Sequence, residues 1–352
     1  MNRLFARLLL IASSAFVTLC TVASPPEAWV EQWYARTTYP AFNRLFVSLT
    51  APLPFSLTSI FIALFIISLF GGLIYTLLFR RSERAQLGSW LKRGLIVALF
   101  VGTWFYLTWG LNYKRSSIED LLALPQTDVA TEEVLALAAK LGAVIDATAS
   151  SPVDVDRATL ALSRSLERYV EELTGTSLVL PSRVKTLPKG TLMSFGYAGF
   201  TSPFFLEAHI DAALPPASAV AVGAHELAHL AGFAGEADAD LVTAIAGLNA
   251  PHPYARYTIA LQLFAQVANE LSEEHRHALV SALPERGRQD LVAMHEATER
   301  YYRKNLARPL NRLYDRYLRS QGVEDGVQDY GRVVTLLVHF DESEEQLQLR
   351  GQ

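Results

Sequence analysis

The sequence predicts a membrane-anchored, mainly α-helical protein, in which two or three transmembrane helices precede an α-rich domain with a small β element. Just over half of the 352 residues are hydrophobic, and two long runs without a charged residue, 57–79 and 94–113, lie in the first third of the chain. Amphipathic helical patterns begin after residue 116 and continue almost to the C-terminus. Residues 177–214 interrupt them with glycine, proline, serine and β-forming residues, which indicates strands and turns.

The two charge-free runs are long enough to be transmembrane helices. At a rise of about 1.5 Å per residue, 57–79 would cover about 34 Å, more than the ~30 Å hydrocarbon core of a bilayer. The run 94–113 contains aromatic residues that favour a membrane interface, namely Trp104, Tyr106, Trp109 and Tyr113. The segment between the runs, 80–93, has five basic residues and one acid, so the positive-inside rule predicts that it is cytoplasmic. Residues 116–352 would then form an extracytoplasmic domain.

The N-terminal region has two further segments. Residues 1–23 combine a basic start, an apolar centre and a small-residue end, the pattern of either a cleaved signal peptide or a membrane anchor. Residues 24–56 mix aromatic, charged and proline residues, and we expect an extracytoplasmic amphipathic segment that either lies along the membrane or packs on the domain. The single cysteine, Cys20, excludes an intramolecular disulfide. A net charge of −4 without a basic block argues against a nucleic-acid-binding protein.

The pattern within 116–352 predicts helices around a short β region. Thr131, followed by two glutamates, begins one helix, and a second helix runs from Asp156 to Leu173. In the β region, apolar residues alternate along 204–210. This segment either pairs with a substrate backbone as an added strand or faces the core.

A group of polar residues lies in the alanine-rich stretch "GAHELAHLAGFAGEADAD", residues 223–240. His225 and His229 are four residues apart, so a helix places both imidazoles on one face, where they can bind one metal ion. Glu226 lies about 100° around the helix, where its carboxylate can reach a water molecule beside the metal and act as general base. The alternative is a pair of hydrogen-bonded core histidines, since such a string arises by chance in roughly one chain in a hundred of this length.

A catalytic zinc site usually takes three protein ligands, and Glu236 is the predicted third. It begins a new helix after a break at glycines, "EADADLVTAIAG". Asp240 lies one turn later on the same face, where it can accept a hydrogen bond from a ligand imidazole. Alternatively, Glu236 is an acid favoured at a helix N-terminus, and Asp238 or Asp240 is the ligand.

The histidine pair followed by E-x-x-A-D resembles the gluzincin type of zinc metallopeptidase, in which a glutamate of the next helix completes the metal site. The chain as a whole resembles a bacterial family of membrane proteins known as domain of unknown function 3810, through segments such as "PLPFSLTSIFIALF", "GYAGFTSPFFLEAHID" and "HELAHLAGFAGEADAD". The resemblance implies a zincin-like domain outside the bacterial cytoplasmic (inner) membrane and brings no established substrate. Family members tend to carry asparagine at the position of Asp240. His209 and Asp211 also depart from the family pattern, either as local variation or as extra polar lining of the site.

Together these features predict a membrane-bound zinc metallopeptidase that acts outside the cytoplasm, with the lipid bilayer and a peptide or protein substrate as its partners. Zinc would lower the pKa of a water molecule, and Glu226 would take its proton. The sequence does not identify the donor that stabilises the developing oxyanion; Tyr330 and His252 are candidates by side-chain chemistry. Two alternatives stay open: an inactive membrane sensor or assembly protein with a structural or vestigial metal site, and a zinc amidase of cell-wall material.

Overall fold

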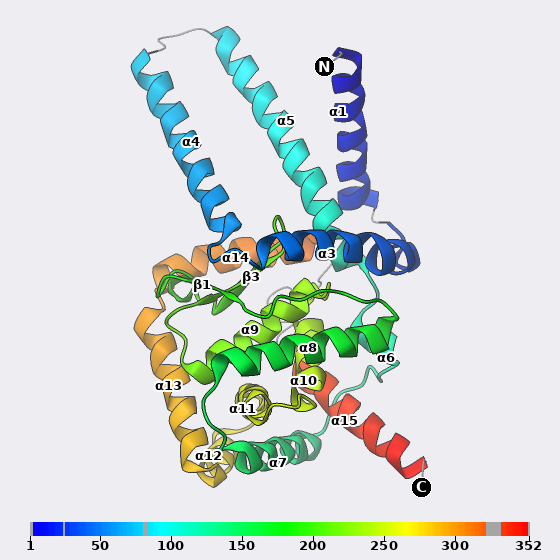
Figure 1. Cartoon of the computed structure of the whole chain (residues 1–352), viewed down its shortest axis with the longest axis vertical. Coiled ribbons are helices and arrows are strands. Elements are labelled where there is room, and N and C mark those ends of the chain that lie inside the picture. The colour runs from blue at the N-terminus through cyan, green and yellow to red at the C-terminus, as the bar shows by residue number, and fades with distance from the viewer. Residues whose placement is uncertain (1–2, 24, 80–83, 322–331, 351–352) are drawn as a thin grey trace.

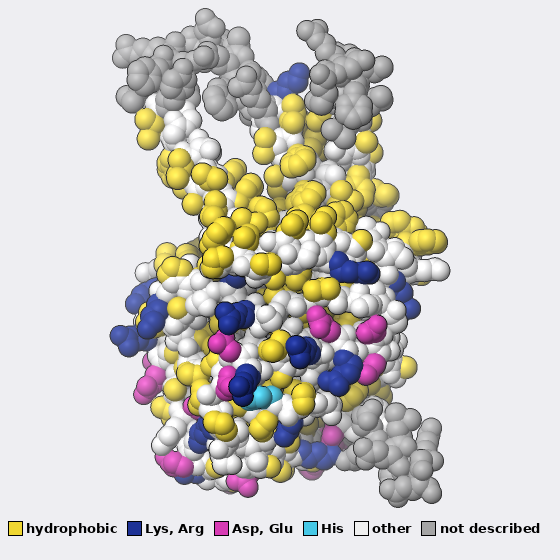
Figure 2. Space-filling view, viewed as in Figure 1, with side chains coloured by type: hydrophobic (Ala, Val, Ile, Leu, Met, Phe, Trp, Pro, Cys, Tyr) yellow, Lys and Arg dark blue, Asp and Glu magenta, His cyan; other side chains and the backbone are white. Residues whose placement is uncertain are grey.

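The computed structural model describes residues 3–23, 25–79, 84–321 and 332–350, which are mostly helical and include one three-stranded sheet (Figure 1). The predicted mainly α-helical chain with a small β element is confirmed. The helical body carries α3 and α14 across one end, and α1, α4 and α5 project from that end (Figure 1). Figure 2 shows charged side chains spread over the body and hydrophobic side chains on the projecting helices.

In the part of the chain that the structure describes, no helix combines the length and the apolar character needed to cross a membrane. This finding overturns the predicted membrane-anchored fold class, with its transmembrane helices at 57–79 and 94–113. The run 57–79 forms α4 (Leu57–Phe79), and residues 94–108 of the second run lie in α5 (Arg84–Thr108). However, α5 begins well before the second run and includes Arg84, Lys92 and Arg93 of the predicted loop 80–93, whose first four residues lie outside the described residues. The absence of charged residues in each run correctly indicated a helix, but it did not predict where that helix begins and ends.

The N-terminal segments lie at the same end of the body, where α1 projects and the following segment packs (Figure 1). Residues 3–23 form α1 (Arg3–Thr18) and the π-helical turn η1 (Leu19–Ala23), while residues 1–2 of the predicted signal segment lie outside the described residues. The next segment forms α2 (Glu27–Trp29), η2 (Val30–Thr38) and α3 (Tyr39–Thr50). Tyr39 Oη and Asn43 Nδ2 donate to the backbone oxygen of Leu230 at 2.8 and 3.1 Å. Of the two alternatives for 24–56, the structure therefore has the segment packed on the domain.

The helices of the body follow the predicted pattern. After the 3₁₀ turn η3 (Gly110–Lys114) and the short α6 (Ile118–Leu122), the chain forms α7 (Thr131–Thr148), α8 (Val155–Thr174), α9 (Pro216–Leu230), α10 (Glu236–Leu248), α11 (Pro253–Asn269), α12 (Glu273–Ala282), α13 (Glu285–Tyr301), α14 (Lys304–Gln321) and α15 (Arg332–Arg350). The two helices predicted to begin near Thr131 and Asp156 are confirmed as α7 and α8.

Helix α9 lies at the centre of the body. It packs against β2 and β3 on one side and against α8, α10 and α11 on others. Most of its buried residues are alanine, valine or leucine, and the small alanine side chains let the neighbouring elements approach closely. The polar residues near its C-terminal end are therefore held in the interior, where their side chains can only face one another or a cavity.

The small sheet consists of β1 (Lys185–Leu187), β2 (Gly199–Ser202) and β3 (Glu207–Asp211), in the order β1-β3-β2. Strand β3 is parallel to β1 and antiparallel to β2, and all five of its residues are buried. Because β3 is paired on both edges, the hypothesis that 204–210 receives a substrate as an added strand is wrong. Among the described strands, β2 has a free edge.

Candidate metal centre

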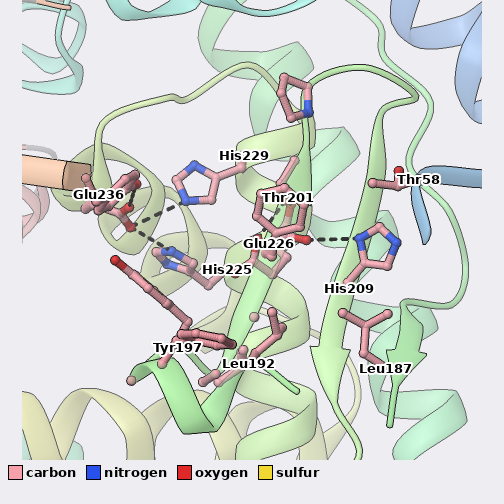
Figure 3. Close-up of a pocket in the computed structure, with 18 of the residues that line it drawn as sticks. Thr58, Leu187, Leu192, Tyr197, Thr201, His209, His225, Glu226, His229 and Glu236 are labelled. Atoms are coloured by element: carbon pink, nitrogen blue, oxygen red, sulfur yellow. Dashed lines mark hydrogen bonds and ion pairs between the residues drawn. The ribbon is translucent and has the colours of Figure 1, made fainter. Parts of the chain in front are cut away.

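Three of the predicted site residues lie near the C-terminal end of α9. His225 and His229 are one turn apart, and their rings meet edge to face with centroids 4.6 Å apart. Figure 3 shows both imidazoles directed towards Glu236. His229 and Glu226 are buried, and the side chain of His225 is 17% exposed, so this end of α9 is open on the His225 side.

A sharp corner between α9 and α10 brings Glu236 back to the two imidazoles. Gly232 forms this corner with a φ of +93°, a left-handed conformation that favours glycine. Oε2 of Glu236 lies 3.1 Å from Nε2 of His225 and 3.4 Å from Nε2 of His229. The three potential ligand atoms all lie within 4.8 Å of one another. Glycine at the corner thus allows residues of two consecutive helices to converge.

These three donors fit a zinc ion. Tetrahedral coordination with bonds of ~2.0–2.1 Å places neighbouring ligand atoms about 3.3 Å apart, close to both separations from Glu236. Nδ1 of His225 lies 2.7 Å from Oδ1 of Asp240, and Nδ1 of His229 lies 2.7 Å from the backbone oxygen of Phe233. Because each of these acceptors holds a proton on Nδ1, Nε2 is the nitrogen of each ring that would bind a metal, after losing the proton that it shares with Glu236. That the group binds a metal stays a prediction.

Among the three acids considered as third ligand, only Glu236 faces the Nε2 atoms. Asp240 contacts the outer nitrogen of His225, and its second oxygen accepts a hydrogen bond of 3.0 Å from Gln266 Nε2. Asp238 contacts the backbone N–H of Ile118 instead, at 3.4 Å. The geometry therefore favours Glu236 as ligand and Asp240 as the residue that orients His225.

The protonation of the cluster follows from its charges. Burial would lower the pKa of His225, but the carboxylates of Asp240 and Glu236 outweigh it and raise that pKa well above its usual value. The pKa of His229 is also raised, because Glu236 outweighs the effect of burial. For Glu236, burial favours the neutral form, but hydrogen bonds from His225 and His229 hold its pKa well below the usual range. The carboxylates of this cluster thus favour the protonated imidazoles, and the imidazoles favour the ionised form of Glu236.

Glu226 lies between the imidazoles and strand β2. Thr201 Oγ1 donates a 2.7 Å hydrogen bond to Oε2 of Glu226. A Cβ atom at Gly199 would collide with the Glu226 carboxylate, so only glycine lets the strand pass this close. Burial raises the pKa of Glu226, although the nearby imidazoles of His229 and His225 act in the opposite direction. This carboxyl is therefore held in place by Thr201, and burial makes its neutral form more favourable than in an exposed glutamate.

A cavity of about 1130 Å³ opens onto His225, Glu226, His229 and Glu236 (Figure 3). Residues of α4, α5, β2, α11 and α14 complete its walls, and most of these residues are apolar or aromatic. A few convergent polar groups in a large apolar pocket are typical of a site that binds a small molecule or a peptide.

A family model described as "Protein of unknown function (DUF3810)" matches residues 34–338, which include every residue of the cluster. The chain belongs to this family. No curated protein and no solved structure matches the chain. The description of the DUF3810 family names no activity, so the function has to be inferred from the chemistry of the site.

In this DUF3810 member, two tyrosines that the sequence did not single out reach the cluster. Tyr314 of α14 donates a 2.9 Å hydrogen bond to Oε1 of Glu236, which leaves Oε2 for the imidazoles. Tyr197 packs edge to face on Tyr314, with centroids 5.7 Å apart. Its buried hydroxyl has no hydrogen-bond partner among the described residues, and burial, with Glu236 nearby, raises its pKa to about 12. The run "GYAG", which ends at the first residue of β2, was a local signal for Tyr197, whereas Tyr314 sits in an ordinary amphipathic helix.

The two residues suggested as oxyanion donors are not part of the described site. Tyr330 lies outside the described residues, and His252 is the N-cap residue of α11 and is not among the residues that line the cavity. His209 does line the cavity, with Nδ1 3.1 Å from the backbone oxygen of Phe200. Asp211 accepts hydrogen bonds from the backbone N–H groups of Gly190 and Leu192, both at 2.8 Å, so it orders the loop before β2.

Proposed function

We propose that this protein is a zinc-dependent metallohydrolase that cleaves peptide bonds. The observation that carries the proposal is the convergence of His225 Nε2, His229 Nε2 and Glu236 Oε2 beside the buried carboxylate of Glu226. Two imidazoles and one carboxylate form a donor set that suits zinc and leaves one tetrahedral position open. When bound there, zinc would supply a Lewis acid that lowers the pKa of water and polarises a carbonyl group.

Glu226 would be the general base. It is next to His225 in the chain, it faces the cavity, and burial raises its pKa, which makes the carboxylate a stronger base. Glu226 would take a proton from the attacking water and deliver it to the leaving amine. Thr201 keeps the carboxylate in this orientation through its hydrogen bond to Oε2.

Tyr197 would donate a hydrogen bond to the carbonyl oxygen as negative charge develops on it. Its side chain extends towards His225 and Glu236 (Figure 3), and its hydroxyl has no competing partner among the described residues. The raised pKa keeps the hydroxyl protonated at neutral pH, so it can donate. A donor that is already aimed at the reacting oxygen needs no reorganisation in the transition state.

The free edge of β2 supports a peptide as substrate. The Asp211 N–H donates to the oxygen of Ala198 at 3.0 Å, and hydrogen-bonded pairs alternate along an antiparallel ladder. Gly199 and Thr201 therefore direct their backbone N–H and C=O groups to the free edge, and both residues line the cavity. An extended peptide can pair with such an edge as an additional strand.

The metal site is tested by metal content. We expect the purified full chain to bind about one zinc ion per molecule and His229→Ala to lose it, because two donors hold zinc far less tightly than three. Mass spectrometry measures the zinc, and a rise in the unfolding temperature on adding zinc gives a second readout. His295→Ala is the control, since that histidine is exposed on α13. Equal zinc content in the two variants would contradict the assignment.

Tyr197→Phe tests the oxyanion donor. We expect its kcat/KM on a cleaved peptide to fall by about 10²- to 10³-fold, the effect of removing one such donor, with zinc content unchanged. Tyr302→Phe removes a hydroxyl from an exposed tyrosine that does not line the cavity and serves as the matched control. A Tyr197→Phe enzyme as active as the wild type would assign the donor role to another group.

A further inference from the structure

The cavity continues from the metal centre along α4, and we propose that this extension binds an apolar stretch of the peptide substrate. The inference rests on the proposed function, because it places the stretch beside the bond that would be cleaved. Ile62, Ala63 and Ile66 of α4 line the cavity together with Thr58 and Ser59 nearer its N-terminus. Residues 58, 62 and 66 are separated by four, so they form one face of the helix.

The length of the α4 face formed by residues 58, 62 and 66 determines how many substrate residues can bind along it. From residue 58 to residue 66 the helix rises about 12 Å, and an extended peptide advances about 3.3 Å per residue, so about four substrate residues fit along it. Its position is fixed relative to the metal centre, because the N-terminus of α4 is attached to the sheet. The Glu207 carboxylate of β3 accepts hydrogen bonds from the N–H groups of Leu57 and Thr58 at 3.0 and 2.9 Å.

The chemistry of the walls selects apolar side chains. Phe105 of α5 and Trp109, the residue after α5, line the cavity, as do Phe195 and Phe204. Neither lysine nor arginine occurs among the described residues that line it, and its acids are confined to the metal centre. A carboxylate or phosphate on the substrate would find no positive partner along α4, whereas an apolar side chain would be removed from water.

The α4 face is uncovered in the free protein. Ile62 and Ile66 are 48% and 46% exposed although both line the cavity. The free edge of β2 borders the same cavity, so a strand that pairs with Gly199 and Thr201 can present side chains to these residues. This edge favours a peptide over a lipid chain, which has no backbone groups to pair.

Binding of uncleaved peptides tests the proposal without requiring catalysis. Two fluorescent peptides of equal length and charge, one with four consecutive leucines and one with four serines, are titrated with the full-length Glu226→Gln protein, and anisotropy is measured. We expect the leucine peptide to bind about tenfold tighter or more. Adding Ile62→Asp and Ile66→Asp should abolish the preference. Leu64→Asp should retain it, because Leu64 is 58% exposed and does not line the cavity.

Two tryptophan variants control for the possibility that the protein with Ile62→Asp and Ile66→Asp misfolds. Ala63→Trp fills the cavity with an apolar group and should also weaken leucine-peptide binding, while Leu64→Trp should not. Equal affinity for the two peptides, or equal losses at residues 63 and 64, would overturn the proposal. Octyl glucoside binding as tightly as the leucine peptide would overturn it too, because the occupant would then be an alkyl chain. Absence of zinc or of hydrolysis would instead refute the proposed function, and the peptide-binding result could still be interpreted by itself.

Discussion

Replacing Glu226 by glutamine is expected to reduce peptide hydrolysis by about 10²- to 10⁴-fold while the zinc content stays that of the wild type. The amide keeps the size of the side chain and can still contact Thr201, but it cannot accept the proton of the attacking water. Because Glu226 is not one of the three converging donors, its loss should not empty the metal site. Initial rates on a quenched-fluorescent peptide library and zinc analysis of the same preparations measure both quantities.

Glu296→Gln is the matched control for this experiment. It makes the same chemical change at an exposed position of α13 that does not line the cavity, so its rate should equal that of the wild type. Zinc retained together with unchanged hydrolysis in Glu226→Gln would exclude Glu226 as the base. Loss of zinc would mean that this carboxylate supports the metal rather than the proton transfer.

The largest effect on stability is expected at Glu207, whose side chain is fully buried in β3. Its carboxylate forms an ion pair with Lys185 and accepts a 2.6 Å hydrogen bond from Thr58 Oγ1, besides those from the N-terminus of α4. Glu207→Gln would leave the Lys185 ammonium, only 15% exposed, without its charged partner and with the backbone oxygen of Phe55 as its remaining acceptor. We expect the free energy of unfolding to fall by about 3–5 kcal/mol, the usual result of breaking a buried pair. Urea denaturation followed by circular dichroism measures it.

The pH dependence of this loss has a definite sign. Burial alone would raise the pKa of Glu207, but Lys185, Thr58 and Leu57 outweigh it and lower the pKa below the usual 4.5. The unfolded chain therefore binds this proton at a higher pH than the folded protein does. The stabilisation is complete above pH 4.5 and is lost as the pH falls through the folded-state pKa, so the difference between wild type and Glu207→Gln should shrink under acid conditions.

Glu285→Gln provides the comparison for Glu207→Gln. Glu285 pairs with Arg288 on the surface of α13, with 67% of its side chain exposed, so its substitution should leave the stability nearly unchanged. Similar losses in the two variants would show that the buried pair contributes nothing beyond an ordinary surface pair.

The parts of the site that were predictable lie close together in the chain. His225, Glu226 and His229 share one helix, whose regular geometry sets their relative directions. Glu236 and Asp240 follow after a single corner at Gly232, so the glycines and the new helical pattern were enough to suggest their convergence. Each inference needed only the rise and twist of a helix and one turn.

The predictions that failed required information about distant contacts. The alternation along 204–210 is the same for a central and an edge strand, and only pairing with β1 and β2 places β3 in the middle of the sheet. Similarly, the charge-free runs indicated helices, but not the start of α5 at Arg84 or the absence of a described membrane-spanning helix.

By itself, the sequence determined the helical character of the chain, the small β element and the local arrangement of two imidazoles and a carboxylate, because these depend on dihedral preferences and side-chain period over a few residues. Only the tertiary structure decided which groups surround them. Thr201 on Glu226, Tyr314 on Glu236 and Gln266 on Asp240 come from separate elements. These contacts form because α9 is buried among its neighbouring elements, and no local sequence pattern identifies which elements become its neighbours.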